Sequence, residues 1–417
     1  MSFKYYHSFV VLCLFTCKLC VAQNDKNKAL FVIVDGISYE QLKKVPTPNL
    51  DAIAKAGGIS RAFVGGEKNT YSQTPTISAV GYNSLLTGTW VNKHNVWDNN
   101  IKDPNYHYWT IFRFFKQAYP FKKTAVFSTW LDNRTKLIGT GMPQTGQLQM
   151  DYYFDGFELD TINFPHDKAS AYINKIDEMV VNEACDYIQE QAPDLSWVYL
   201  EYTDDMGHRY GNSEQFNEAI RKMDAQMGRL WEAVKKRQDK TGEKWQIFIT
   251  TDHGRSEPAG KDHGGQSDAE RSTWIVTNAA GLNEYFLKSS DAKQLPAIVD
   301  IMPTIGRHLQ IHFPKAQAFE LDGIPLTGKL SVVNPAVKME KDIINVTWKS
   351  QEKDGKVRIW LAVTNHFEEG GSDNYMLIQQ LPVTAESAAI DVSKFPKGFF
   401  KIVIEGKYNT VNRWIVK

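Results

Sequence analysis

Short apolar runs of strand length recur along the first two thirds of the chain. The first run, 29–34, ends directly at Asp35 and Gly36, which is typical of a fully buried strand followed by a turn. Similar runs occupy 124–127, 197–202, 245–250 and 274–277. Helical periodicity separates them, over 49–56, 169–191 and 213–236. Strands that alternate with helices predict an α/β fold with a mostly parallel central sheet and helices on both faces.

The pattern changes after about residue 328. The later apolar segments are short, rich in β-branched and aromatic residues, and separated by Gly, Asp, Asn and Pro, without a helical period. They occupy 343–348, 356–363, 375–380, 399–405 and 411–416. We therefore expect a larger α/β domain over 23–328 and a small all-β sandwich domain over 329–417.

The first 22 residues are predicted to be a secretory signal peptide. Lys4 precedes a mostly apolar run over 9–20, and small residues up to Ala22 precede a polar stretch. The run is shorter than the ~20 residues that a membrane-spanning helix needs, so we expect no stable membrane span. The mature chain is therefore predicted to be exported, either periplasmic or secreted. A membrane anchor is the competing interpretation of the same segment.

The cysteine count and the net charge restrict which covalent links and which binding partners are expected. Three of the four cysteines lie in the predicted signal peptide, so Cys185 alone remains and no internal disulfide is expected in the mature chain. Lipid attachment at Cys17 or Cys20 is a weaker alternative, because no Gly or Ala precedes either residue. The 48 basic residues balance 48 acidic ones, so binding of a nucleic-acid polymer through bulk charge is not expected.

Carboxylates and imidazoles follow the predicted buried strands. They are Asp35, Asp204, His208, Asp252, His253 and His263. Each has an ordinary alternative, since Asp-Gly is common in turns, an Asp and His four apart can cap a helix, and neighbouring side chains can face opposite ways. Because the carboxyl ends of parallel strands bind ligands at one edge of the sheet, we expect these side chains to converge. Three carboxylates and three imidazoles can hold two divalent metals, with zinc as the leading candidate.

A hydroxyl-rich segment precedes a predicted helix over 79–86. A hydroxyl at the start of a helix meets free backbone N–H groups and the positive end of the helix dipole, which suits an anionic phosphoryl group. One of these hydroxyls is a candidate nucleophile, but Ser78, Thr76 or Ser84 can equally be a helix N-cap. Position alone does not choose among these three.

The order of the motifs resembles the alkaline phosphatase superfamily, and within it the nucleotide pyrophosphatase/phosphodiesterase-like branch, over about 29–326. The matching motifs are Val-Asp-Gly at 34–36, Pro-Thr-Ile-Ser at 75–78, Ser-Leu-Leu-Thr-Gly at 84–88, Lys-His-Asn-Val at 93–96, Asp-Asp-Met-Gly-His at 204–208, Thr-Asp-His-Gly at 251–254, His-Gly-Gly at 263–265 and Asp-Ile-Met-Pro-Thr at 300–304. The resemblance implies an alkaline phosphatase-like catalytic domain that hydrolyses a small-molecule phosphate ester.

The resemblance also implies a role for each candidate residue. One zinc would be held by Asp204, His208 and His263. The second zinc would be held by Asp35, Asp252, His253 and the Ser78 oxygen. Ser78 matches the family's nucleophile because it stands six residues before Ser84. Metal coordination would activate its hydroxyl, and a phosphoserine intermediate would follow.

The substrate class is less well defined by the sequence. The diesterase branch has an Asn three residues beyond the nucleophile, where this chain has Gly81. Asn83 and Arg255 are therefore candidates for binding a substrate phosphate oxygen, with a solvated surface position as the alternative for Arg255. A phosphomonoesterase and a metal-binding pseudoenzyme scaffold remain alternatives to a diesterase. The aromatic residues between Tyr71 and Trp109 are expected to pack against the sheet more than to line a nucleobase pocket.

Overall fold

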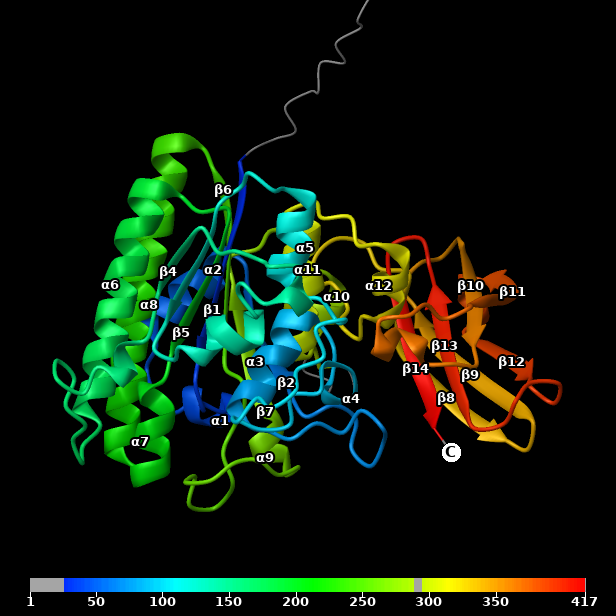
Figure 1. Cartoon of the computed structure of the whole chain (residues 1–417), viewed down its shortest axis with the longest axis horizontal. Helices are drawn as coiled ribbons and strands as arrows, with labels where there is room; N and C mark the ends of the chain where they lie inside the picture. The colour runs from blue at the N-terminus through cyan, green and yellow to red at the C-terminus, as the bar shows by residue number, and fades with distance from the viewer. Residues whose placement is uncertain (1–25, 289–294, 417) are drawn as a thin grey trace, which may run out of the picture.

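The computed structural model describes residues 26–288 and 295–416 (Figure 1). The predicted signal peptide and its cysteines lie outside these residues. A seven-stranded sheet, in the order β2-β7-β6-β1-β5-β3-β4, forms the centre of the larger part. Its strands are β1 (Asn27–Val34), β2 (Gly58–Phe63), β3 (Thr124–Ser128), β4 (Tyr152–Phe154), β5 (Leu195–Leu200), β6 (Lys244–Thr250) and β7 (Ser272–Thr277).

Most of the sheet is parallel, as predicted. β1 pairs in parallel with both β5 and β6, and β3 pairs in parallel with β5 and β4. β7, which the sequence predicted only as a strand, pairs antiparallel with β2 and with β6. The sheet therefore carries an antiparallel edge, and the neighbouring carboxyl ends of β5, β1 and β6 lie at its centre.

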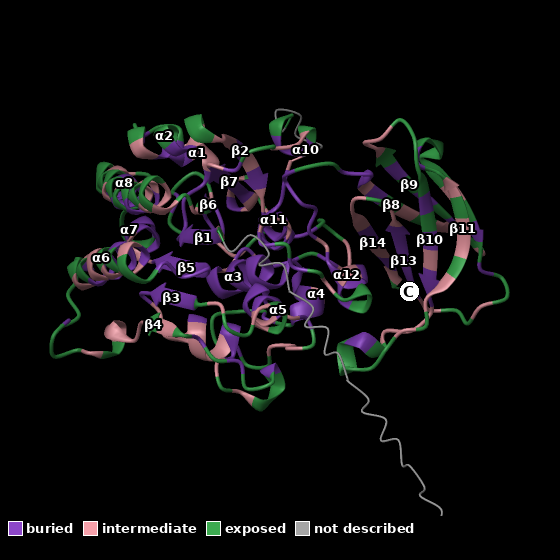
Figure 2. Cartoon of the chain, turned by 90° about the horizontal axis from the view of Figure 1, so that it is seen from above, coloured by how far each residue is buried: buried purple, intermediate pink, exposed green. Residues whose placement is uncertain are grey.

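Helices cover both faces of the sheet because its central strands are apolar on both sides. Leu30 and Val32 of β1 belong to one buried cluster, while Phe31 and Ile33 belong to the other. Figures 1 and 2 show α6 and α8 over the first face, and α3, α5 and α11 over the second. The longer helices are α2 (Pro48–Ala56), α3 (Ser78–Thr87), α5 (Ile111–Ala118), α6 (Ala171–Gln191), α7 (Tyr202–Tyr210), α8 (Glu214–Thr241) and α11 (Ile301–His308).

Shorter helical segments complete the connections. The α-helical ones are α1 (Tyr39–Leu42), α4 (Val91–His94), α9 (Asp268–Arg271), α10 (Glu284–Leu287) and α12 (Lys315–Glu320). The others are the π-helical η1 (Asn133–Ile138) and the 3-10 segments η2 (Pro143–Thr145), η3 (Phe157–Leu159), η4 (Ile298–Asp300), η5 (His366–Glu369) and η6 (Val383–Ala385). No helix in the described part of the chain is long and apolar enough to cross a membrane.

The C-terminal part consists of antiparallel sheets, as expected. One sheet has the order β11-β10-β13-β14 and the other β12-β9-β8. Their strands are β8 (Val332–Glu340), β9 (Ile343–Ser350), β10 (Lys356–Ala362), β11 (Met376–Pro382), β12 (Ser387–Asp391), β13 (Phe399–Glu405) and β14 (Thr410–Val416). Alternating residues of both sheets, such as Ile344 and Ile359, are buried in one shared cluster. The domain boundary at 328/329 stays a prediction.

A buried polar network joins the two parts of the molecule. The ammonium of Lys93 contacts Asp322 Oδ1 at 2.6 Å and Asn412 Oδ1 of β14 at 3.0 Å. The ammonium of Lys401 lies 2.6 Å from Glu320 Oε1 and 2.8 Å from Asp373 Oδ2. Both lysine side chains are fully buried. The β-sheet part is therefore packed against the α/β part through paired charges as well as apolar contacts.

Candidate metal centre

Three neighbouring strands bring the predicted metal ligands together. Asp35 follows β1, and Asp252 and His253 follow β6, which pairs with β1. β5, on the other side of β1, leads into α7, which carries Asp204 and His208. Figure 1 shows α7 and α9 at the same edge of the sheet. The predicted ligands therefore lie close together at the carboxyl edge of the sheet, as expected.

The first group consists of Asp35, Asp252 and His253, all of which are buried. His253 Nε2 lies 3.3 Å from Asp35 Oδ1 and 3.1 Å from Asp252 Oδ2. These two carboxylate oxygens have no hydrogen-bond partner. Since a buried polar atom without a partner is costly, the two oxygens fit a site that a cation completes.

A second group, Asp204, His253 and His263, shares His253 with the first, and His208 lies next to it on its more open side. His208 Nε2 is 3.1 Å from Asp204 Oδ2 and 3.1 Å from His263 Nε2, and His263 Nε2 is 3.9 Å from Asp204 Oδ1. The side chain of His208 is 44% exposed, so this group faces solvent. The rings of His253 and His263 stack at 3.6 Å, which places the two groups in contact. Carboxylate and imidazole ligands in this mixture suit zinc.

The ionisation of the two groups follows from their mutual charges. Burial lowers the pKa of His253, but the carboxylates of Asp252 and Asp35 raise it more, to about 9. Burial and the neighbouring His253 lower the pKa of His263 to about 4. Burial and Asp35 raise the pKa of Asp252. Because a divalent cation would compete with protons for these groups, metal binding here should depend on pH.

Ser78 is the hydroxyl that reaches this cluster. It is the first residue of α3, whose N-cap is Ile77, and its Oγ lies 3.2 Å from His253 Nε2. The other candidates point elsewhere, since Thr76 Oγ1 donates to Gly265 O and Ser84 Oγ donates to Val80 O. The geometry thus distinguishes Ser78 from two residues that position along the chain alone did not separate from it, and it agrees with the nucleophile position that the resemblance implies.

The helix that carries Ser78 closely approaches the segment that follows β6. A Cβ atom added at Gly81 would lie 2.8 Å from the backbone oxygen of Asp252 and 2.9 Å from its Cβ. Real Cβ contacts essentially never occur below 3.0 Å. Glycine at this position therefore permits the approach of α3 to the metal-ligand loop.

Comparison with known proteins agrees with this geometry. Residues 29–300 match the family model for type I phosphodiesterase / nucleotide pyrophosphatase. The chain belongs to this family. It is 26% identical over 245 residues to ectonucleotide pyrophosphatase/phosphodiesterase family member 7 of Homo sapiens, which covers 56% of this chain and 49% of that protein. It is 24% identical over 266 residues to ectonucleotide pyrophosphatase/phosphodiesterase family member 5 of Homo sapiens. This match covers 60% of this chain and 49% of that protein.

The chain spans about half the length of these relatives of the phosphodiesterase family. Among solved structures, a putative sulfatase from Bacteroides thetaiotaomicron is similar in fold, with a TM-score of 0.50 at 13% identity, over 85% of this chain and 86% of that one. The family and the α/β fold predicted from the sequence are thereby confirmed.

In this phosphodiesterase-family chain, Arg255 is buried behind Asp204, one of the predicted metal ligands. It is 2% exposed, and its Nη1 donates to Asp204 Oδ1. Its Nε and Nη2 donate to the carbonyl oxygens of Gly260 and Lys261 at 2.6 and 2.8 Å. The guanidinium is thus occupied by hydrogen bonds to Asp204 and to two backbone oxygens, and its contact with a substrate phosphate stays a prediction.

Asn83 is also enclosed by protein. It is 2% exposed within α3, and its side-chain oxygen is buried without a hydrogen-bond partner. Its contact with a substrate phosphate stays a prediction. The sequence singled it out only for its proximity to Ser78 along the chain.

A different asparagine lies beside Ser78. Asn99, in the exposed loop after α4, accepts the N–H of Ala79 with its Oδ1 at 2.9 Å. This contact fixes the amide at the first turn of α3 and leaves its NH2 group as a donor. No local motif marks Asn99, because its contact with Ala79 depends on how the loop folds back onto α3.

The aromatic residues of this region mainly pack, as expected. Tyr71 stacks on Trp414 at 5.5 Å, and Trp90 stacks on Phe63 at 5.9 Å. Trp97, in the same loop as Asn99, is the exception at 50% exposed.

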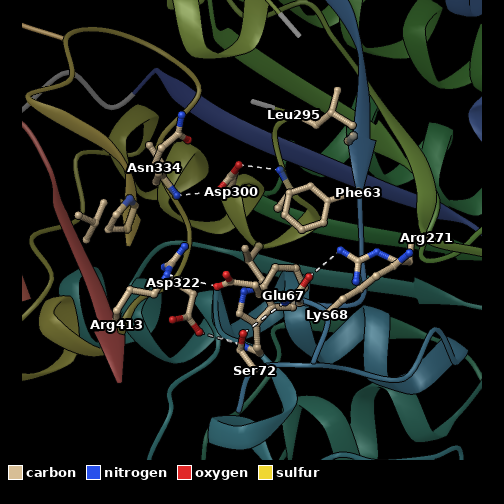
Figure 3. Close-up of a pocket in the computed structure, with 18 of the residues that line it drawn as sticks. Phe63, Glu67, Lys68, Ser72, Arg271, Leu295, Asp300, Asp322, Asn334 and Arg413 are labelled. Atoms are coloured by element: carbon tan, nitrogen blue, oxygen red, sulfur yellow. Dashed lines mark hydrogen bonds and ion pairs between the residues drawn. The ribbon is translucent and has the colours of Figure 1, made fainter. Parts of the chain in front are cut away.

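A cavity of about 790 Å³ lies away from the candidate metal centre. It is formed between β2 and the β8 and β14 strands, and Figure 3 shows Phe63, Arg271 and Arg413 among the side chains around it. None of the predicted catalytic or metal-binding residues lines it. Its Arg271 donates to the carbonyl oxygens of Gly65 and Gly66, so this cation is occupied by the protein itself.

Proposed function

We propose that this chain is an exported two-zinc phosphohydrolase that cleaves small-molecule phosphate esters through a phosphoserine intermediate. Phosphodiesters or nucleotide pyrophosphates are the favoured substrates, in keeping with membership of the phosphodiesterase family. The observation that carries the proposal is the position of the Ser78 hydroxyl. It lies at a helix N-terminus, 3.2 Å from His253 Nε2, and the same nitrogen lies 3.1 and 3.3 Å from two carboxylate oxygens that accept no hydrogen bond.

The proposed metal ligands form two sets. Asp204, His208 and His263 would hold one zinc. Asp35, Asp252, His253 and the Ser78 oxygen would hold the other. When bound, two zinc ions supply Lewis acidity and lower the pKa of the serine hydroxyl toward neutrality.

The protein's own groups then set the course of the reaction. Ser78 Oγ attacks phosphorus, and the bond from phosphorus to the leaving oxygen breaks, giving a phosphoserine. Water attacks the phosphorus in the second step and releases Ser78 Oγ. The positive end of the α3 dipole and the NH2 group of Asn99 would favour negative charge on the phosphoryl oxygens.

Replacement of the nucleophile tests the proposal. Ser78→Ala should lower turnover of bis-p-nitrophenyl phosphate by at least about 1000-fold while the fold and most zinc binding persist. Ser84→Ala is the matched control, because Ser84 lies on the same helix and donates to Val80 O. Full activity in Ser78→Ala would refute the assignment.

Two further measurements separate the rival functions. A higher kcat/KM for p-nitrophenyl phosphate than for the bis ester would favour a phosphomonoesterase. Metal analysis of the purified protein should find two zinc ions per chain, and fewer than two would favour a pseudoenzyme scaffold.

Export and domain organisation belong to the same proposal. The mature protein should begin near residue 23, which N-terminal sequencing of the exported chain checks. The catalytic domain is proposed to span 23–328 and the β-sandwich domain 329–417.

A further inference from the structure

Two buried tyrosines contact the same oxygen of Asp35. Tyr199, on β5, donates its hydroxyl to Asp35 Oδ2 at 2.8 Å, and Tyr82, on α3, donates to the same atom. The two hydroxyl oxygens are 2.8 Å apart, and the ring centroids are 4.8 Å apart. Tyr82 is 0% exposed and Tyr199 is 2% exposed. Solvent therefore does not compete for these contacts.

The two oxygens of this carboxylate have different surroundings. Oδ2 faces the two tyrosines, whereas Oδ1 has no hydrogen-bond partner and lies 3.3 Å from His253 Nε2. The backbone is held as well, because Thr203 Oγ1 donates to the carbonyl oxygen of Asp35 at 2.6 Å. Rotation of the carboxylate would break the tyrosine contacts, so Oδ1 stays directed toward the candidate metal group.

We propose that Tyr82 and Tyr199 are positioning residues that fix Asp35 with Oδ1 toward the metal and thereby set metal affinity at the Asp35/Asp252/His253 site. The proposal rests on the proposed function, in which Asp35 is a ligand. Groups that orient a ligand by hydrogen bonding typically change metal affinity by about 10- to 100-fold when removed.

The same contact connects the metal ligand to the nucleophile. Tyr82 lies four residues after Ser78, about one turn along α3. Its hydroxyl therefore couples the position of this helix to the orientation of Asp35. Tyr199 comes from β5 and holds the carboxylate from the sheet, so the two tyrosines make the contact from independent elements.

Removal of each hydroxyl tests the proposal while keeping the ring. Tyr82→Phe and Tyr199→Phe should each weaken zinc binding at this site about 10-fold, measured by competition with a chelator of known affinity. In the cobalt-substituted protein, both variants should change the visible absorption bands, which respond to the ligand geometry. If the tyrosines contributed only ring packing, both variants would keep the zinc affinity and the cobalt absorption bands of the wild type.

Tyr285→Phe is the matched control. Tyr285 is also buried and donates its hydroxyl to a buried carboxylate, Asp300 Oδ2, at 3.1 Å, but it lies outside the metal groups. Its loss should leave zinc affinity and the cobalt spectrum unchanged. Equal effects of Tyr285→Phe and Tyr82→Phe would overturn the proposal, because a general loss of stability would then explain both.

A fourth variant separates this proposal from the proposed function. Asp35→Ala should remove one metal per chain. If it does so while Tyr82→Phe and Tyr199→Phe bind zinc as the wild type does, the positioning role is wrong and the metal assignment stands. If Asp35→Ala keeps both metals, the assignment of Asp35 as a ligand fails, and the proposed positioning role fails with it.

Discussion

Each aspartate of the candidate metal centre is oriented by neighbours that lie far away in the sequence. Asp35 Oδ2 is held by two tyrosines, and Asp252 Oδ1 accepts the N–H of Gly36 at 3.2 Å. Asp204 is held from behind by Arg255. Such contacts determine which oxygen of each carboxylate is directed into the candidate metal centre, so the surroundings of each aspartate matter as much as its identity.

Asn99 provides a prediction at the residue scale. Asn99→Asp keeps an oxygen for the Ala79 N–H but removes the NH2 donor beside Ser78. We expect kcat to fall about 100-fold, as for the loss of one donor to a developing oxyanion, with zinc content unchanged. Steady-state kinetics with bis-p-nitrophenyl phosphate measures this.

Asn100→Asp is the control for that substitution, since Asn100 is exposed in the same loop. The Asn100→Asp variant introduces the same negative charge one residue further along the chain from Ser78. Equal losses in the two variants would indicate a charge effect and contradict the donor role.

Asp300 provides a prediction about pH. Its carboxylate accepts the N–H groups of Ala297 and Ile324 and the Tyr285 hydroxyl, but burial outweighs these contacts and raises its pKa to about 7. In the unfolded chain an Asp releases its proton near pH 3.9. Between about pH 4 and pH 7 the folded state therefore binds more protons, so a rise in pH across this range destabilises it.

Asp300→Asn should remove this pH-dependent contribution. The melting temperature of the metal-free wild type should fall more between pH 4.5 and pH 7 than that of the variant. Asp391→Asn, at an exposed site on β12, should follow the wild type. Parallel curves for wild type and Asp300→Asn would contradict the raised pKa.

At the scale of elements, a capping contact between two helices positions half of the candidate metal centre. Asp177 of α6 accepts the backbone N–H groups of Glu201 and Tyr202 at 3.2 and 3.0 Å, at the start of α7. Since α7 carries Asp204 and His208, the buried carboxylate of α6 anchors the helix that presents two predicted ligands.

Asp177→Ala should therefore affect both stability and metal binding. We expect a loss of about 1–2 kcal/mol in the free energy of unfolding, as for other helix caps. Zinc affinity should fall about 10-fold at the site of Asp204, His208 and His263. Denaturant unfolding and chelator competition measure the two effects.

Asp167→Ala is the matched control. Asp167 accepts the N–H groups of Ala171 and Tyr172 at the start of α6, a helix without predicted ligands. Zinc affinity should not change in this variant. A similar loss of affinity in both variants would argue against a specific role for the α7 cap.

The elements also show what the sequence could predict. Fully buried strands such as β1 and β5 carry continuous apolar runs and were predicted. β2 was missed because it begins with Gly58 and alternates buried and half-exposed residues, and β4 was missed because it has only three residues. β8 contains Pro335 and a positive-φ residue, Asn334, which interrupt a strand pattern.

The candidate site was predictable in part for the same physical reason. Ligand types and their order after buried strands are local features, and the structure brings those six side chains together. The contacts of Asn99, Tyr82 and Tyr199 depend on loop folding and on pairs of elements distant in sequence, which no local pattern encodes. Their functional roles stay predictions until the variants are measured.

At the scale of the whole molecule, the contact between the two parts depends on paired buried charges. Lys401 of β13 lies between two carboxylates, one of them Glu320 on α12. Removal of one member of such a group leaves the others charged and unpaired in a dry environment. The β-sheet part and the α/β part should therefore unfold together.

Lys401→Met should lower the free energy of unfolding by about 3–5 kcal/mol, as expected when a buried ion pair loses one partner. Lys338→Met is the control, since the Lys338–Glu340 pair on β8 is exposed and its loss should have little effect. Guanidinium unfolding followed by tryptophan fluorescence measures both. Equal midpoints for the two variants would contradict the role of the buried network.

The Lys93–Asn412 contact also has a consequence for biosynthesis. Its partners are 319 residues apart, so at about 5–20 residues per second the ribosome needs on the order of 15–60 s between them. During that interval Lys93 has been synthesised but its hydrogen-bond partner Asn412 has not. Tyr71 likewise lacks its stacking partner Trp414 until the last residues are made. A nascent chain stopped before residue 412 should therefore be cut by protease near Tyr71, whereas the complete folded protein should resist cleavage there.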